Sequence, residues 1–132
     1  KSLSSVHFLK LTLKEDGEII SENFYWRGLE DGNWQALRDL PKVELNISTK
    51  VKESGDDWIL TTTLINTNDV PVLMIRLKVV GDNSGERLLP VLYSDNYVSL
   101  MPGEKRNIVM KLKDMDTRGE DPEVEISGFN VK

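Results

Sequence analysis

An alternation of apolar and polar residues with a period of two dominates this sequence and constrains its fold more than any other feature. Successive side chains of a β-strand point to opposite faces of a sheet, so a strand with one buried face alternates in this way. The alternation is clearest in residues 9–14, 43–52, 73–79 and 107–113. Residues 58–66 are rich in threonine and β-branched residues, which strands favour. The pattern predicts an all-β chain.

In each alternating segment the apolar residues share one face, which we expect to lie against a core. These faces consist of Leu9, Leu11 and Leu13; Val43, Leu45, Ile47, Thr49 and Val51; Leu73, Ile75, Leu77 and Val79; and Ile108, Met110 and Leu112. Trp58 precedes another apolar pair, Leu60 and Leu64, and is also predicted to lie in the core.

Turn-forming residues separate the strand-like segments. They are Asp16-Gly17, Ser54 to Asp57, Asn68-Asp69, Gly81 to Gly85 and Pro102-Gly103. In Pro102-Gly103, proline presets φ and glycine accepts positive φ, as a type II turn requires. The last strand is predicted from Val124 to Val131, with a bulge at Gly128, where the apolar phase shifts.

The strand count indicates the architecture. Seven to nine short strands at a spacing of roughly 8–12 residues are typical of a β-sandwich. A long amphipathic helix is not predicted anywhere; residues 31–40 could form one short helical turn, with Trp34, Leu37 and Leu40 at i, i+3 spacing. The chain is therefore predicted to form an immunoglobulin-like β-sandwich of about seven to nine antiparallel strands.

Composition excludes several classes of function. The chain has no cysteine, which rules out disulfides, thiol catalysis and cysteine-rich zinc sites. Its net charge is -5 and its basic residues are evenly spread, so binding to nucleic acid has little electrostatic support. The apolar runs are too short to span a bilayer, and no membrane insertion is expected.

The residue inventory gives little support to catalysis. The single histidine, His7, lies in a strand-like segment, and no serine sits in a nucleophile-elbow motif. Glycosidases hold two carboxyl groups about 5–9 Å apart on rigid elements. The carboxylate pairs here lie in turn-like segments, at Asp56-Asp57, Asp114 with Asp116, and Glu120-Asp121. We expect them to be solvated.

Two acidic clusters contain oxygen ligands of the kind that calcium prefers. They are Asp82, Asn83 and Glu86, and Asp114 with Asp116. Neither spacing matches a twelve-residue calcium loop, so solvated turns are the favoured interpretation and no metal or other cofactor is expected.

Three consecutive aromatic residues, Phe24, Tyr25 and Trp26, allow two interpretations. With Trp34 nearby, they could form a flat platform on which a sugar ring stacks. Alternatively, Phe24 and Trp26 fill the core between two sheets, while Tyr25 points the opposite way and covers an edge or meets another domain. Large aromatic side chains dominate sandwich cores, so the core interpretation is favoured.

Several stretches in a fixed order carry a resemblance to a known family. They are Asn23 to Trp26, Leu40 to Val43, Ser94 to Tyr97, Leu100 to Glu104 and Ser127 to Lys132. Together they resemble the C-terminal immunoglobulin-like domain of glycoside hydrolase family 2 enzymes. The nearest branch comprises the exo-β-D-glucosaminidases, mannosylglycoprotein endo-β-mannosidases and β-mannosidases. The resemblance extends from about Val6 to Lys132 and departs from the branch at Arg27-Gly28-Leu29.

The resemblance implies that residues 1–132 form one domain, the C-terminal module of a glycosidase acting on β-mannosides or β-glucosaminides. It places the catalytic glutamates in a preceding (β/α)8 barrel, so the isolated domain is not expected to be an enzyme. The implied role is structural, with the upstream domains of the same polypeptide as partners and an oligosaccharide as a further candidate. The fragment is expected to be a monomer from an extracytoplasmic protein, located in a bacterial periplasm or secreted.

Tyr25, Trp34 and Tyr97 are the candidates for interdomain or sugar contacts, because they are large, polar-tipped and near turns. Two alternatives stay open. The chain could be an autonomous carbohydrate-binding module, or a sandwich for protein interaction or adhesion.

Overall fold

A computed structural model describes residues 4–29 and 34–132 of the chain. The chain divides into two compact units, which we call the hairpin unit (residues 1–40) and the sandwich unit (residues 41–132). The described residues form nine strands and two short 3₁₀ turns. They are β1 (Val6–Glu15), β2 (Glu18–Gly28), η1 (Gln35–Leu37), β3 (Asn46–Ser54), β4 (Asp57–Ile65), β5 (Val72–Gly81), β6 (Leu92–Tyr93), β7 (Val98–Leu100), β8 (Lys105–Lys113), η2 (Asp114–Asp116) and β9 (Pro122–Ser127). The predicted all-β, immunoglobulin-like fold is confirmed.

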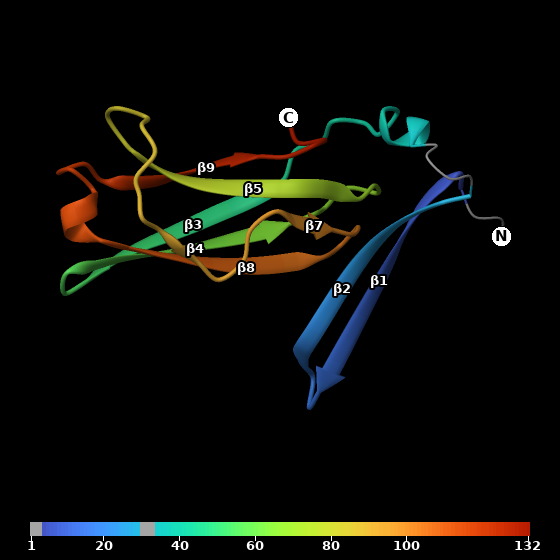
Figure 1. The fold of residues 1–132 in the computed structure, drawn as a ribbon, viewed down its shortest axis with the longest axis horizontal. Helices are drawn as coiled ribbons and strands as arrows, with labels where there is room; N and C mark the ends of the chain where they lie inside the picture. The colour runs from blue at the N-terminus through green and yellow to red at the C-terminus, as the bar shows by residue number, and fades with distance from the viewer. Residues whose placement is uncertain (1–3, 30–33) are drawn as a thin grey trace. The chain divides into compact units, whose positions relative to one another are not determined.

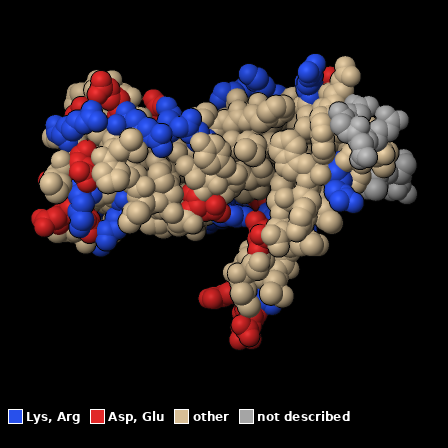
Figure 2. Space-filling view, viewed as in Figure 1, with Lys and Arg blue, Asp and Glu red and all other residues tan. Residues whose placement is uncertain are grey.

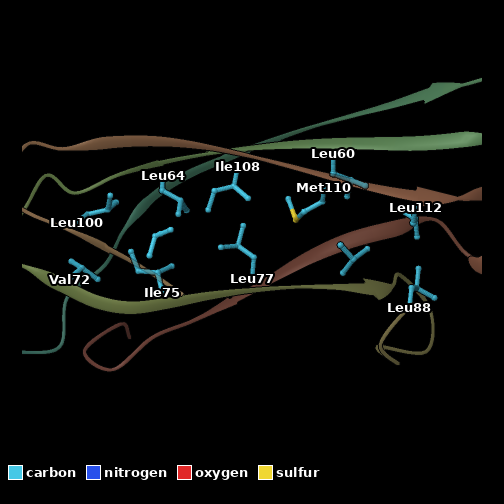
Figure 3. Packing of buried hydrophobic residues seen from close by; sticks show 12 residues of the cluster. Leu60, Leu64, Val72, Ile75, Leu77, Leu88, Leu100, Ile108, Met110 and Leu112 are labelled. Atoms are coloured by element: carbon cyan, nitrogen blue, oxygen red, sulfur yellow. The ribbon is translucent and has the colours of Figure 1, made fainter. Parts of the chain in front are cut away.

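Two antiparallel sheets form the sandwich unit, one with strand order β3-β4-β8-β6 and one with β7-β5-β9 (Figure 1). Their facing surfaces enclose one hydrophobic core (Figure 3). It contains Leu60 and Leu64 of β4; Ile108, Met110 and Leu112 of β8; Val72, Ile75, Leu77 and Val79 of β5; Leu88; and Val98 and Leu100 of β7. Each such side chain contributes about 1.5–3 kcal/mol when it leaves water, so this core stabilises the unit.

The inner faces predicted for β5 and β8 are confirmed. Leu73, Ile75, Leu77 and Val79 are fully buried, and so are Ile108 and Met110. Trp58, at the start of β4, lies against the core but is only partly buried, because its indole Nε1 reaches outward to donate a 2.8 Å hydrogen bond to Asp114 Oδ1.

The inner face predicted for residues 43–51 is only partly correct. Val43 and Leu45 pack against the core, whereas Ile47 and Val51 are exposed. β3 is the edge strand of its sheet and pairs only with β4. Within the sandwich unit the opposite sheet has one strand fewer, so no described strand of that sheet covers the inward side of β3.

The predicted turns agree with the backbone. Asp16 and Gly17 both have positive φ, 49° and 85°, and connect β1 to β2. At Pro102-Gly103, Gly103 has φ 80° and the Glu104 N–H donates to the Met101 carbonyl at 3.0 Å, as in a type II turn.

The bulge predicted at Gly128 is wrong. β9 ends at Ser127, and Val131 then forms an isolated parallel bridge with Val43. Gly128 leaves room for this change of direction, since a Cβ atom there would lie 2.5 Å from Val131 Cγ2.

The hairpin unit consists of β1 paired with β2, followed by the turn η1. A register shift between Leu13 and Lys14 interrupts the ladder near the tip of the hairpin. The short helical turn predicted in residues 31–40 is present as η1, which buries Leu37; residues 31–33 lie outside the described residues.

Candidate docking surface and contact residues

One face of the β1–β2 hairpin carries an aromatic cluster. The rings of Phe8 and Phe24 stack with their centroids 5.4 Å apart, and Trp26 meets Phe8 edge-on at 5.8 Å. Trp34 adds a further edge contact to Trp26 at 6.4 Å. The prediction that Phe24 and Trp26 fill the core between two sheets is therefore wrong. They lie on β2, which pairs only with β1 and belongs to the hairpin unit.

The opposite face of the hairpin carries an apolar stripe. In the register of β1 and β2, Leu9 pairs with Tyr25, Leu11 with Asn23 and Leu13 with Ser21, so these side chains share one face. Leu9, Leu11 and Leu13 are 46%, 51% and 60% exposed. We call Leu9, Leu11, Leu13 and Tyr25 the leucine face. The prediction that these leucines lie against a core is wrong within the hairpin unit, where β1 pairs only with β2 and no further described strand covers them.

The predicted contact residues Tyr25 and Trp34 do not share a face. Tyr25 belongs to the leucine face, whereas Trp34 contacts Trp26 on the opposite side of the hairpin. Both are exposed. Two aromatic rings on opposite faces of one hairpin do not make a single sugar-stacking platform.

Tyr97, the third predicted contact residue, lies in the sandwich unit just before β7. Its side chain is exposed, and the Arg76 guanidinium lies 5.9 Å from the centre of its ring. Its backbone φ of 53° is in the left-handed region, so the protein holds Tyr97 in a conformation that is strained for a non-glycine residue.

The residues that precede Tyr97 explain why this stretch forms a motif. The chain crosses here from one sheet to the other, between β6 and β7. Ser94 Oγ accepts a 2.9 Å hydrogen bond from the Val109 N–H of β8. Asn96 Oδ1 accepts from the Leu77 N–H of β5 at 2.8 Å, and Asn96 Nδ2 donates to the Leu77 carbonyl at 3.0 Å. Side chains thus replace a missing strand partner on both sheets.

Two buried asparagines, Asn66 and Asn130, also bond to backbone groups of other segments through their side chains, and the sequence does not predict this role. Asn66 Nδ2 donates to the carbonyls of Val70 and Leu100 at 2.9 and 3.1 Å. Asn130 Oδ1 accepts from the Leu73 N–H at 2.9 Å, and its Nδ2 donates to the Pro71 and Pro41 carbonyls. Asn66 ends the strand-like segment 58–66 and Asn130 lies near the end of the last predicted strand, and this position at a strand end is the one sequence signal that could have indicated a structural role.

The carboxylates are engaged in ion pairs and turns. Asp57 forms salt bridges with Lys113 and Lys111 at 2.6 and 2.9 Å, and these lysines lower the pKa of its carboxyl group. Glu120 Oε2 accepts a 2.9 Å hydrogen bond from the Ser84 N–H, which lowers the pKa of Glu120. Both groups are stabilised in the charged form, whereas a catalytic acid needs a raised pKa.

The predicted calcium candidates also have other partners. Asp82 Oδ1 accepts from Asn83 Nδ2 at 2.8 Å, Glu86 pairs with Arg118 at 2.8 Å, and Asp114 accepts from Trp58. Within the described residues, no three or more His, Cys, Asp or Glu side chains are grouped so that they could hold a metal ion. His7 Nδ1 lies 3.4 Å from the Ser4 carbonyl, at the limit of a hydrogen bond.

No helix in residues 4–29 or 34–132 has the length and apolar character that a membrane crossing requires. Lysine, arginine and acidic side chains are interspersed on the face seen in Figure 2.

The two stacked sheets and the side-chain bridges at their crossover define the class of this protein, an immunoglobulin-like sandwich domain. Residues 23–131 match the family described as the exo-beta-D-glucosaminidase Ig-fold domain, and the chain belongs to that family. The resemblance to the immunoglobulin-like domains of glycoside hydrolase family 2 enzymes is thereby confirmed.

The curated relatives are much longer than this chain. An exo-beta-D-glucosaminidase of Hypocrea jecorina is 31% identical over 98% of the chain, which covers 17% of that protein. The corresponding enzyme of Amycolatopsis orientalis is 33% identical, with 98% and 14% covered. A mannosylglycoprotein endo-beta-mannosidase of Lilium longiflorum is 34% identical over 70% of the chain and 10% of the relative. The chain thus spans less than a fifth of each.

A solved structure gives the same fold. The crystal structure of Amycolatopsis orientalis exo-chitosanase CsxA superposes with a TM-score of 0.87 at 28% identity. The match covers 98% of this chain and 18% of that one.

Proposed function

We propose that this chain is a non-catalytic, structural module at the C-terminal end of a glycoside hydrolase acting on β-glucosaminides. The observation that carries this proposal is the family match. It is supported by relatives named exo-beta-D-glucosaminidase, of whose length the chain covers less than a fifth. One mannosidase also matches, over a shorter share of the chain, so β-mannosides are the second substrate class. The two units, residues 1–40 and 41–132, would serve as one module.

The geometry of the carboxylates supports a structural role. A glycosidase needs one carboxyl group as a general acid and a second as nucleophile or base, both facing the same sugar. Here Asp57 forms ion pairs with two lysines, Glu120 holds a loop through the Ser84 and Asn83 amides, and Asp114 accepts a hydrogen bond from Trp58. These acidic groups hold strands and turns together, and the lowered pKa values of Asp57 and Glu120 are the opposite of what a catalytic acid needs.

The experiment compares the isolated chain with its full-length parent on aryl β-glucosaminide and aryl β-mannoside. We expect turnover by the parent, with glucosaminide preferred, and none by the isolated chain. Hydrolysis by the chain alone would refute the non-catalytic role. An immunoblot of the source organism should show a native product several times heavier than 15.0 kDa; a band at 15.0 kDa would contradict membership of a larger protein.

The exposed rings of Trp34 and Tyr25 favour a second candidate function, an autonomous carbohydrate-binding module. Titration of the chain with chitosan or mannan oligosaccharides, followed by tryptophan fluorescence, tests it. We expect a flat titration because the two rings lie on opposite faces of the hairpin. A saturable shift that Trp34→Ala removes would favour the binding module.

We propose an extracytoplasmic location for the parent, in a bacterial periplasm or in the medium. The relatives named exo-beta-D-glucosaminidase support the proposal, because glycoside hydrolases of this kind are often secreted. Fractionation of the source organism with the same antibody checks it, and signal confined to the cytoplasm would contradict it.

A further inference from the structure

We infer that the leucine face (Leu9, Leu11, Leu13 and Tyr25) is the surface through which the hairpin unit docks onto the module that precedes it in the parent polypeptide. The inference rests on the proposed function, since it requires a longer parent. It adds which surface makes the contact and what chemistry the partner presents, namely an apolar surface of the same chain.

The first argument is the stability of the hairpin. A two-stranded ribbon is marginally stable at best in water, and a third strand or a packed face is normally needed. β1 and β2 pair only with each other among the described strands. Within the hairpin unit, the aromatic cluster packs one face of the ribbon and the leucine face is left exposed.

The second argument is the chemistry of that face. Residues two apart in a strand lie about 7 Å apart on one side, so Leu9, Leu11 and Leu13 form a continuous stripe, with Tyr25 beside Leu9. The Lys10–Glu22 ion pair lies on the other face, because Lys10 and Glu22 alternate with the leucine-face positions. In Figure 2 the hairpin is mostly uncharged along its length and acidic at its tip. Contiguous apolar stripes of this kind mark interaction sites.

The third argument identifies the occupant. The Ig-fold family match begins at residue 23, inside β2, so β1 lies outside it. Relatives nevertheless match 98% of the chain, which leaves only about three residues unmatched and therefore includes β1. β1 is thus shared with the long relatives although it lies outside the Ig-fold match. More than four fifths of the length of each relative lies outside the matched region and could supply the surface that covers β1. A neighbouring module on the N-terminal side fits this placement.

The test measures hydrogen–deuterium exchange of β1 and β2 in the full-length parent. Amides of both strands should exchange at least about tenfold more slowly in the wild type than in Leu11→Lys, which places a charge in the stripe. Val109→Lys is the matched control, since Val109 is an apolar strand residue of the sandwich unit with a similar exposure of 41%. It should leave exchange in the hairpin unchanged.

Equal exchange rates of the hairpin amides in wild type and Leu11→Lys would overturn the inference. Rapid exchange of these amides in the wild-type parent would also overturn it, and that measurement needs no variant. Protection that disappears on dilution would also overturn it, because the cover would then be a second copy. Leu13→Ala, a milder change, should raise exchange less than Leu11→Lys does. The activity assay separates the two proposals: an inactive parent with a protected hairpin contradicts the function alone, and an active parent with an unprotected hairpin contradicts the docking alone.

Discussion

Replacing Asn130 with alanine should destabilise the sandwich unit far more than an average polar substitution. The side chain is buried and makes two hydrogen bonds of 2.9 Å, to the Leu73 N–H and the Pro71 carbonyl, and a longer one of 3.3 Å to the Pro41 carbonyl. Each buried polar group left without a partner costs about 1–3 kcal/mol. Counting the two short bonds, Asn130→Ala should lower the free energy of unfolding by about 2–6 kcal/mol.

Urea denaturation followed by tryptophan fluorescence measures this loss. With a typical slope of about 2 kcal/mol per M urea, the midpoint should fall by about 1–3 M urea. Asn107→Ala is the control, because Asn107 is exposed and accepts one hydrogen bond from Thr63. Its effect should stay within about 0.5 kcal/mol. Asn130→Asp keeps the acceptor for Leu73 but places a charged oxygen against the Pro71 carbonyl, so it should be as destabilised as Asn130→Ala. Equal midpoints for Asn130→Ala and Asn107→Ala would refute the reasoning.

Three further changes test other parts of the sandwich unit. Trp58→Ala removes a ring packed on the core and should cost about 3 kcal/mol, at the lower end for such changes because Trp58 is only partly buried; an unchanged melting temperature would contradict the packing. Gly128→Ala forces a Cβ atom against Val131 and should lower the free energy of unfolding by about 1–3 kcal/mol in the same melting experiment. Gly55→Ala is the comparison, because a Cβ atom there meets no neighbour and only the backbone conformation of the turn is affected. The lysine partners lower the pKa of Asp57, so their stabilisation is present above its ordinary value of 3.8 and is lost as the pH falls through the folded pKa. The difference in stability between wild type and Asp57→Asn should therefore shrink in acid, and a difference that stays constant from pH 7 to about 2 would contradict the ion pairs.

Periodicity predicted the strands well because the alternation of side chains between two faces is fixed by the local geometry of an extended chain. The stretch from Leu73 to Val79 alternates as predicted and its inner face is fully buried. Leu9, Leu11 and Leu13 alternate just as regularly and are exposed. The pattern indicates which face is suited to burial, but the surface that covers it depends on segments distant in sequence or on other modules.

The site residues were harder to predict for a related reason. Tyr25, Trp34 and Tyr97 were chosen by size and by nearness to turns, and they remain predictions as contact residues. The sequence does not predict the structural roles of Asn66, Asn96 and Asn130, because their hydrogen-bond partners lie in distant segments of the chain. Asn130, for example, bonds to Pro71, 59 residues away. An isolated polar residue gives no sign of such a partner until the topology is known.

The bridge between Val43 and Val131 has a consequence for how this unit can be rearranged. Val43 donates to the Asn130 carbonyl and Lys132 donates to the Val43 carbonyl, so the first and last residues of the sandwich unit lie side by side. Adjacent ends are the condition under which circular permutation and insertion into another protein's loop are tolerated. A permutant that joins Lys132 to Pro41 through a short linker and opens at the Gly55 turn should keep the same core. The unit can thus be inserted into a host chain with little displacement of the host's own backbone.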